Sequence, residues 1–264
     1  MAANTNVNRL NAPTLETLFE LLCEEHITAW QVQLTVPLGR AADRPQMILQ
    51  PFDLLDVVPR VAALKQRALA RGITLMPGNN LGYFGDSEAL LRSPHAGGTD
   101  HWRGCQAGKL VMGIESDGGV KGCPSLQSQS YVGGNLTTQT LDAIWNTSPQ
   151  LAFNRTRGGN DPATARLWGR CADCAFAQVC KGGCTFTAHA LFGRPGNNPY
   201  CHHRARMLAA DGKRERLVAT APAPGKPFDH GLFELLEEAL DAPDPHAEVA
   251  GAGLVQITRP AARA

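Results

Sequence analysis

Four of the chain's eight cysteines fall within one short stretch, CADCAFAQVCKGGC at residues 171–184. A packed apolar core has no need of so many thiols, whereas metal ions and iron–sulfur clusters bind cysteine as the thiolate. The N-terminal sequence MAANTNVNRLNAP lacks the basic start and apolar middle of a signal peptide, so we expect a cytoplasmic protein. Disulfides are rare in that compartment, and metal or cluster ligation is therefore the preferred interpretation.

The overall composition argues against two classes of partner. The 264 residues include 25 Lys+Arg and 24 Asp+Glu, giving a formal net charge of +1. This balance provides no general attraction to nucleic acid or to an anionic membrane. No apolar run approaches the roughly 18 residues needed to span a bilayer. We therefore expect neither a nucleic acid nor a membrane as a partner.

The first hundred residues alternate between helical and strand patterns. The expected order is helix, strand, helix, strand, over residues 14–25, 30–36, 52–70 and 73–76. Such alternation is typical of parallel α/β structure. A barrel needs about eight such units, and an open sheet usually has about five strands. Two strands cannot bury both of their faces, so we expect them to pair with a partner protein or to belong to a longer protein.

One cysteine, Cys23, is interpreted as a structural residue of the first predicted helix. Thr14 is the expected N-cap of this helix. Cys23 shares a single helical stripe with apolar neighbours and is expected to be an inert core thiol. The other members of the stripe are Leu15, Leu18, Phe19 and Leu22.

The next part of the chain has turn-rich patterns that bring two cysteines together. Asp117-Gly118 predicts a β-hairpin over residues 110–123, because the turn requires positive φ. The hairpin directs Cys123 back toward the part of the chain that carries Cys105. A short helix is expected over residues 140–146 with Leu141, Ile144 and Trp145 inward, and a second from Ser148 to Gly158-Gly159.

Beyond about residue 216 the composition shifts to alanine and proline. The stretches ATAPAPGKP and APDPHAEVAGAG indicate a linker or tail. An amphipathic helix over residues 228–240 is the alternative for part of this segment. The preferred interpretation is an Ala/Pro-rich tail.

The spacing of the remaining seven cysteines indicates two sites. The run at 171–184 has the form C-x2-C-x5-C-x3-C, and sixteen further residues lead to Cys201. A four-iron cluster takes four cysteines and so does a structural zinc ion, so seven thiolates imply two sites, one of them a ligand short. Gly182-Gly183 allows the backbone to approach a cluster closely.

The whole pattern resembles the SPASM domain, the C-terminal extension of many radical S-adenosylmethionine (radical SAM) enzymes that modify peptides and proteins. The shared pattern is C-x12-G-x4-C from Cys105 through Gly118 to Cys123, then the run at 171–184 and Cys201. The spacer also matches, with GN followed by LDAIW at 134–145. The preceding part resembles the latter portion of a radical SAM partial barrel, with VPLGRA at 36–41 following a strand.

This resemblance implies a fold and a domain division. The fold class is α/β, with the C-terminal portion of a partial (β/α) barrel followed by a small irregular α+β iron–sulfur domain. The expected division is residues 1–100 for the partial barrel, 101–215 for the SPASM auxiliary-cluster domain and 216–264 for the tail.

The resemblance also implies a ligand set for two auxiliary [4Fe-4S] clusters. An inner cluster would bind Cys105, Cys123 and Cys184. Some relatives supply a fourth ligand shortly after the first cysteine, but residues 106–114 contain no cysteine. That position would be open to substrate, water or another side chain. The outer cluster would bind the remaining four cysteines, Cys171, Cys174, Cys180 and Cys201.

The catalytic cluster of radical SAM enzymes is held by C-x3-C-x2-C, and no such triplet occurs in this sequence. The chain begins, at NTN, with what resembles the end of the fourth barrel strand. We therefore expect S-adenosylmethionine only in the complete enzyme, and no activity from this chain alone. The expected partners are a peptide or protein substrate and a separate N-terminal radical SAM half.

Other interpretations stay open from the sequence. A structural zinc module in an interaction protein is the main alternative, with His202 and His203 as candidate ligands beside Cys201. A small electron carrier is a third. The Gly-rich loop PGNNLGYFG at 77–85 lacks the lysine of a phosphate-binding loop. An ordinary connection is the preferred interpretation for this loop and for Arg40, and a role facing the cofactor is the alternative.

Overall fold

A parallel three-stranded sheet forms the first part of the protein. The computed structural model describes residues 1–126, 129–155, 161–224 and 230–247. Strands β1 (Ala2–Val7), β2 (Ala29–Leu34) and β3 (Thr74–Pro77) lie in the order β1-β2-β3, all parallel. The last two confirm the predicted strands. The first is a full strand, where the sequence indicated only a strand end at NTN.

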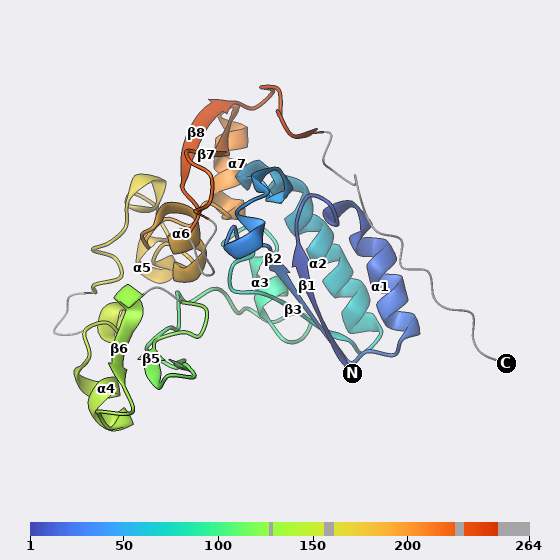
Figure 1. Ribbon diagram of the computed structural model, residues 1–264. Helices are drawn as coiled ribbons and strands as arrows, with labels where there is room; N and C mark the ends of the chain where they lie inside the picture. The colour runs from blue at the N-terminus through green and yellow to red at the C-terminus, as the bar shows by residue number, and fades with distance from the viewer. Residues whose placement is uncertain (127–128, 156–160, 225–229, 248–264) are drawn as a thin grey trace.

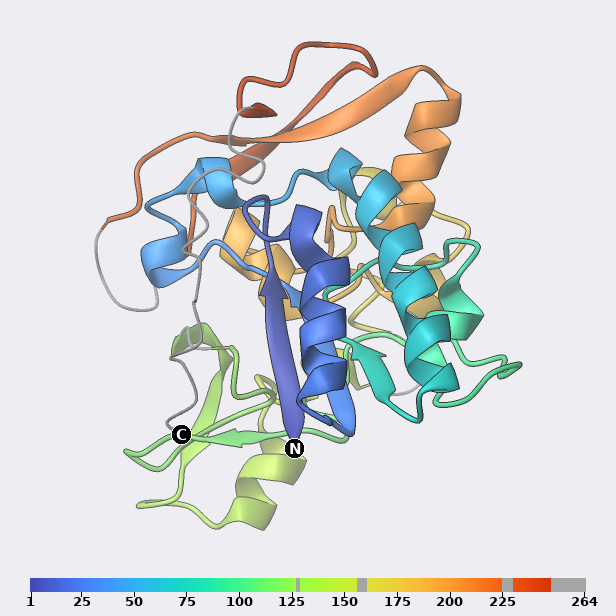
Figure 2. The ribbon, with the colours of Figure 1, turned by 90° about the vertical axis from the view of Figure 1, so that its right-hand side faces the viewer.

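Two helices cover one face of this sheet. Helix α1 (Leu15–Glu24) connects β1 to β2, and helix α2 (Leu54–Ala70) connects β2 to β3. Figure 2 shows the two helices side by side in front of the strands. Gly72 ends the second helical segment with a φ of 71°, as its position in the sequence predicts. The helix–strand alternation is therefore confirmed.

The apolar stripe of α1 faces this sheet. Leu15 and Phe19 are fully buried, and Cys23 is half-buried against the same core. Phe19 stacks on Trp30 of β2 with ring centroids 5.9 Å apart. The predicted cap differs, because Thr14 makes no side-chain cap and instead donates its hydroxyl to the Asn11 carbonyl.

A second, antiparallel sheet lies in a separate lobe (Figure 1). After the short helix α3 (Glu88–Arg92), strands β4 (Gly113–Ile114), β5 (Gly119–Lys121) and β6 (Val132–Asn135) pair in that order. The β4–β5 hairpin turns at Gly118, whose φ of 85° confirms the predicted Asp-Gly turn.

Helix α4 (Leu141–Thr147) packs against β6 in this lobe and confirms the helix expected over 140–146. The Thr140 hydroxyl caps it by accepting from the Ala143 N–H. Ile144 is fully buried and Trp145 packs beside it, but Leu141 is exposed, contrary to the predicted inward side. The helix expected to begin at Ser148 is reduced to one 3-10 turn, Ala152–Asn154. Residues 156–160, where it would have ended, lie outside the described residues.

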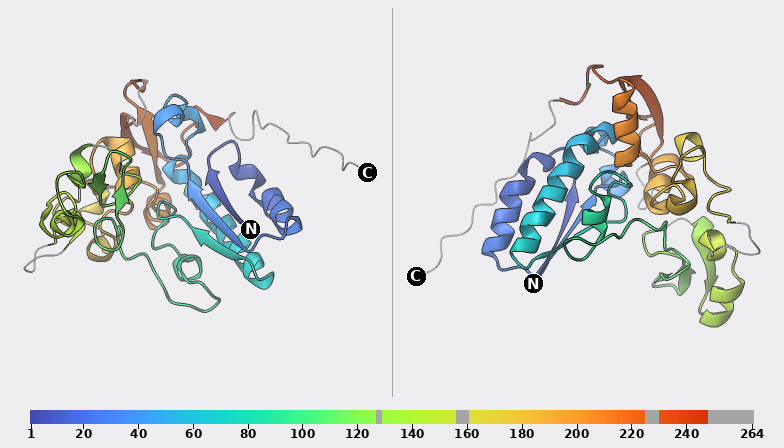
Figure 3. Two further views of the ribbon diagram at one scale, coloured as in Figure 1. Left: turned by 60° about the horizontal axis from the view of Figure 1, so that its bottom comes forward. Right: turned by 180° about the vertical axis from the view of Figure 1, so that it is seen from behind.

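Three short helices carry the cysteine-rich segment. These are α5 (Ala177–Cys180), α6 (Thr185–Phe192) and α7 (His202–Ala210). They lie between the second sheet and the C-terminal hairpin, as two further views show (Figure 3). The remaining 3-10 turns are Ala12–Thr14, Gly39–Ala41, Pro45–Met47, Pro51–Asp53, Gln129–Tyr131 and Gly169–Cys171.

The segment expected to be a tail contains a hairpin. Strand β7 (Lys213–Ala219) pairs antiparallel with β8 (Phe233–Ala239). The amphipathic helix considered over residues 228–240 is therefore wrong over 233–239, which are extended and paired. Residues 228–229 lie outside the described residues. Across the hairpin, Arg214 and Arg216 both bind Glu238, and these cross-strand ion pairs favour the strand.

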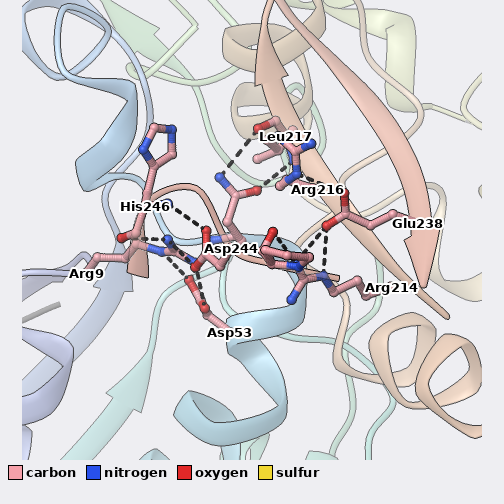
Figure 4. Close-up of polar contacts among 10 residues, drawn as sticks. Arg9, Asp53, Arg214, Arg216, Leu217, Glu238, Asp244 and His246 are labelled. Carbon is pink, nitrogen blue, oxygen red and sulfur yellow. Dashed lines mark hydrogen bonds and ion pairs between the residues drawn. The ribbon is translucent and has the colours of Figure 1, made fainter. Parts of the chain in front are cut away.

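This hairpin is attached to the loops that follow β1 and β2. Gln50 accepts a hydrogen bond from the Leu217 N–H at 2.6 Å, and its amide approaches the Leu217 carbonyl at 3.4 Å. Arg9 binds Asp53 and Asp244 at once, each at 2.8 Å. Figure 4 shows these contacts in one continuous polar layer. In the described part of the chain, no helix has both the length and the apolar content of a membrane span.

Candidate metal centre

Four cysteines line one cavity of about 390 Å³ in the second half of the protein. These cysteines are up to thirty positions apart along the chain, and other wall residues come from a loop more than eighty positions earlier. Aromatic and glycine residues complete much of its wall. The cysteines are Cys171, Cys174, Cys180 and Cys201, and the other wall residues include Tyr83, Phe84, Phe176, Gly182, Gly183 and Asn198.

Short helical turns place these thiols. Cys171 ends a 3-10 turn, Cys180 ends α5, and Cys201 immediately precedes α7. After Cys180 the chain reverses through consecutive residues in the left-handed region, with Gly182 and Gly183 at φ of 76° and 75°. A Cβ on Gly183 would lie 2.8 Å from the Tyr83 ring, so only glycine fits this wall.

Polar groups surround the sulfur atoms of this cavity. The Phe176 N–H donates to Cys174 Sγ at 3.4 Å. The backbone amides of Asn198, Gly183 and Arg204 lower the pKa of Cys171, Cys180 and Cys201 respectively, in opposition to burial. Amide donors of this kind stabilise charge on sulfur and tune a bound metal centre.

Burial raises the pKa of the cavity thiols. It raises the pKa of Cys180 strongly, with further contributions from the charges of Cys201 and Cys171. Burial also raises the pKa of Cys201 to about 12, against the opposing N–H of Arg204. These thiols therefore hold their protons at neutral pH, and a metal centre that binds them must displace those protons.

A second group of cysteines lies around a small apolar cluster next to the second sheet. Cys105 and Cys123 both pack against Ala107, Leu126 and Tyr131. The predicted hairpin therefore does bring these two cysteines to one place. Its geometry is fixed by the Gly108 N–H, which donates to the Gly122 carbonyl at 2.9 Å.

Cys184 lies at the start of α6, between the two groups of thiols. Burial raises its pKa to about 11, and the charge of Cys105 is the next cause. Thr187 and the backbone of Phe186 lower that pKa in part. Cys184 is thus close to Cys105, while its carbonyl accepts a hydrogen bond from the Ala188 N–H of α6 at 3.2 Å.

Tyr83 connects the two groups, and sequence reasoning did not single it out. It belongs to the Gly-rich loop at 77–85, interpreted above as an ordinary connection. It lines the cavity, and its hydroxyl accepts a hydrogen bond from the Cys184 N–H at 3.0 Å. One feature of the sequence could have indicated this role, namely the adjacent aromatic residues Tyr83 and Phe84 inside an otherwise polar, Gly-rich loop.

The other residues considered from the sequence have different positions. His203 lines the cavity and packs edge-on against Phe176, with ring centroids 4.9 Å apart. His202 is buried against Gly85 and does not line the cavity. Arg40 is exposed on a 3-10 turn. Within the described ranges, no three His, Cys, Asp or Glu side chains already converge on one point as a single-ion site.

Comparison with known proteins places this part of the chain in a family. Residues 105–175 match SPASM, an iron–sulfur cluster-binding domain. AdoMet-dependent heme synthase of Nitratidesulfovibrio vulgaris is 25% identical over 78% of this chain and 54% of its own length. The mycofactocin maturase MftC of Mycobacterium ulcerans is 28% identical over 74% of this chain and 48% of its own.

A third curated relative and a solved structure are also similar to this chain. The serine-type anaerobic sulfatase-maturating enzyme of Klebsiella pneumoniae is 32% identical over 47% of this chain and 25% of its own length. Native anSMEcpe with bound AdoMet and Kp18Cys peptide superposes with a TM-score of 0.53 at 16% identity, over 79% of this chain and 54% of that one. This likeness shows the fold.

The chain spans about half the length of the first curated relatives it matches. The match to the SPASM domain begins at Cys105, the first of the seven cysteines. The mixed α/β fold, with its parallel sheet before the cysteine-rich part, agrees with the solved structure over most of this chain. Residues 105–175 therefore match a SPASM iron–sulfur cluster-binding domain, and about three quarters of the chain is similar to the AdoMet-dependent heme synthase and to the mycofactocin maturase MftC.

Proposed function

We propose that this chain is the C-terminal, cluster-carrying part of a radical SAM peptide-modifying enzyme and holds two auxiliary [4Fe-4S] clusters. The observation that carries the proposal is the sorting of seven cysteines into two groups. Four line one cavity, and two others pack on a separate apolar cluster close to the seventh. The division into residues 1–100, 101–215 and 216–264 remains a prediction.

The outer cluster would bind Cys171, Cys174, Cys180 and Cys201. Four thiols are the donor set of a [4Fe-4S] cluster. The cavity volume of about 390 Å³ supports a cluster more than a single ion, because closed four-coordinate zinc leaves little free space. The cluster would supply a one-electron redox centre, and the surrounding amide groups would stabilise the added charge on sulfur.

The inner cluster would bind Cys105, Cys123 and Cys184. Its fourth position stays open in this proposal to substrate, water or another side chain. Gln106 is the first residue after Cys105, and its amide already donates to the Gly104 carbonyl at 2.9 Å. Tyr131 is nearby, but its hydroxyl is engaged with Nδ1 of His189 at 3.1 Å. This supports a three-cysteine site whose neighbours have other partners.

The clusters would bind a peptide or protein substrate or conduct electrons. The maturase names of two relatives support this substrate class. The parallel sheet supports a partner with further strands. Within the described residues, no strand pairs with the outer edge of β1 or of β3. A radical SAM half carrying C-x3-C-x2-C would complete the barrel and bind S-adenosylmethionine.

The alternative is a structural zinc module of an interaction protein. One observation favours it, since the imidazole of His203 lines the same cavity as the four cysteines. Its edge-on contact with Phe176 gives the ring another structural role. Acid-labile sulfide distinguishes the two, because zinc sites contain none.

The test is anaerobic reconstitution followed by iron, sulfide and zinc analysis. Two clusters predict about eight iron atoms per chain with matching sulfide. Stoichiometric zinc without sulfide, in protein purified anaerobically from iron-replete cells, would refute the proposal. About four iron atoms per chain would leave one cluster and refute the two-cluster form.

The absence of activity from the isolated chain is tested separately. Reconstituted protein is incubated with dithionite and S-adenosylmethionine, and 5′-deoxyadenosine is measured by chromatography. We expect no turnover by the chain alone. Turnover after adding a separately expressed N-terminal half would make the chain one subunit of a split enzyme, and turnover without it would contradict the proposal.

A further inference from the structure

Tyr83 lies at the junction of the partial barrel and the two cysteine groups. It is 1% exposed and follows β3, more than twenty residues before Cys105. Its hydroxyl donates to the Asn79 carbonyl at 2.6 Å and accepts from the Asn198 side-chain amide at 3.0 Å. The same oxygen accepts from the Cys184 N–H at 3.0 Å. The hydroxyl is therefore fully engaged, with its oxygen facing the Cys184 side.

The backbone of Tyr83 holds the other group of cysteines. Its carbonyl accepts a hydrogen bond from the His203 N–H at 3.1 Å, two residues beyond Cys201. The Cys201 thiol also lies against this carbonyl, with Sγ 3.7 Å away. One residue thus contacts Cys184 through its side chain and the Cys201 turn through its main chain.

The ring of Tyr83 is held in place from two sides. It packs on Trp102 with centroids 5.2 Å apart, and the Trp102 indole N–H donates to the Cys180 carbonyl at 3.1 Å. The Arg92 guanidinium lies 5.7 Å from the Tyr83 ring centroid and 5.5 Å from that of Trp102. On the opposite side the ring fills the space that a Cβ on Gly183 would need.

We propose that Tyr83 is a positioning residue that sets the two cysteine sites relative to each other, its hydroxyl acting on Cys184 and its carbonyl on the Cys201 turn. The inference rests on the proposed function, because it requires both sites to hold clusters. The inference identifies one residue of the partial barrel that contacts both cysteine sites. The hydroxyl and the carbonyl act on different sites, so they can be separated by substitution.

Tyr83→Phe removes only the hydroxyl and keeps the ring and the carbonyl. In the wild type, the negative end of the hydroxyl dipole faces the Cys184 amide. Removing this negative end stabilises the inner cluster in its reduced, more negative state. We expect a more positive reduction potential and a changed electron paramagnetic resonance signal for the inner cluster. The outer cluster should shift less, because the charge of Cys184 acts on this hydroxyl more strongly than that of Cys180. Each cluster is measured alone, the inner one in Cys174→Ser protein and the outer one in Cys105→Ala protein.

Two further variants make the test specific. Tyr200→Phe is the matched control, because Tyr200 is equally buried and its hydroxyl donates to the Leu49 carbonyl at 2.7 Å, away from the cysteines. It should change neither cluster. Trp102→Phe removes the donor to the Cys180 carbonyl but keeps an aromatic ring beside Tyr83, so it should shift the outer signal more than the inner one.

The outcomes separate this inference from the proposed function. Wild-type protein without sulfide refutes the proposed function, whatever the variants do. Wild-type protein with two clusters, combined with a Tyr83→Phe protein that behaves like Tyr200→Phe, refutes the inference alone. An equal shift of both clusters also refutes the separation of roles. If Tyr83→Phe loses iron, loss confined to the inner site supports the role at Cys184, and loss from both sites contradicts it.

Discussion

Arg9, two residues after the first strand, forms an ion pair with Asp244, near the end of the described chain, with Nη1 and Oδ2 2.8 Å apart. The same guanidinium binds both carboxylate oxygens of Asp53 at the start of α2, at 2.8 and 3.0 Å. Arg9 is 5% exposed. One buried cation therefore fastens the C-terminal segment to the carboxyl ends of the parallel strands.

Replacing Arg9 by Ala should loosen this attachment. Burial already raises the pKa of Asp53, and without Arg9 the carboxylates of Asp53 and Asp244 lose the cation that pairs with both. We expect a loss of about 3 kcal/mol in unfolding free energy. Hydrogen exchange should accelerate in residues 213–239. Arg206→Ala is the control, since its pair with Asp86 is largely exposed and should contribute below about 1 kcal/mol. Equal effects of the two variants would contradict the role of Arg9.

Gly183→Ala should reduce cluster loading. Its φ of 75° strains any other residue, and the added Cβ would lie 2.8 Å from the Tyr83 ring and 2.9 Å from Asn198 Cβ. Gly212→Ala is matched to it, because Gly212 has a φ of 69° with no atom within 4 Å of the added Cβ. Both variants carry about 1 kcal/mol of backbone strain, but only Gly183→Ala deforms the cavity wall. Iron per chain after reconstitution should fall in Gly183→Ala alone. A similar fall in both variants would show that backbone strain, and not deformation of the cavity wall, causes the loss.

Stability should depend on pH through Lys65. This lysine is 2% exposed, its Nζ donates to the Leu91 and Ser93 carbonyls, and burial lowers its pKa from 10.5 to about 8, with Arg92 adding to the shift. Between these values the unfolded chain binds more protons than the folded one, so stability rises with pH from about 8 to about 10.5 and is lost as pH falls through 8. At about 1.4 kcal/mol per pH unit, the full change is at most about 3 kcal/mol.

The Lys65 effect is isolated by comparing wild type with Lys65→Met in metal-free protein. Urea midpoints are measured by circular dichroism from pH 7.5 to 10.5. The wild type should gain stability relative to the variant across this interval. A constant difference between the two proteins would show that Lys65 keeps its ordinary pKa in the fold.

Cys174→Ser and Cys23→Ser should separate ligand from structural thiols. Cys174 lines the cavity and accepts a backbone N–H at its sulfur, so its replacement should lower iron from about eight to about four per chain. Cys23 packs against the first core on α1, so its replacement should leave iron unchanged. Loss of a cluster from Cys23→Ser, with none from Cys174→Ser, would show the ligand assignment to be wrong.

Local patterns predicted much of this fold. The stripe on α1, the Asp-Gly turn at Gly118 and the helix capped by Thr140 each depend on neighbours in sequence, which a single sequence displays. The C-terminal hairpin was missed for the opposite reason. Arg214 and Arg216 form ion pairs with Glu238 across the hairpin. These tertiary contacts favour a strand in a segment whose local pattern had suggested an amphipathic helix.

Two cysteine sites remain a prediction from the sequence, whereas the contacts that Tyr83 makes to both groups were not predicted. Spacing alone indicated two sites, because seven thiols exceed what one site takes. Tyr83 reaches these sites from a loop more than a hundred residues before Cys201, and its role depends on the folded contacts to Cys184 and His203. A pattern among neighbouring residues cannot predict a contact between residues that lie so far apart in sequence.

The strands of the parallel sheet pair in the same order in which they occur along the chain. During synthesis, β2 and β3 therefore each emerge after the strand with which they pair, and the three-stranded sheet needs no later segment to set its register. Arg9 and Tyr83, by contrast, each make a contact with a residue beyond position 180, and these contacts form only after that part of the chain is synthesised. The protein should thus assemble from its N-terminal end, with the cysteine sites and the C-terminal hairpin closing last on a sheet that is already in place.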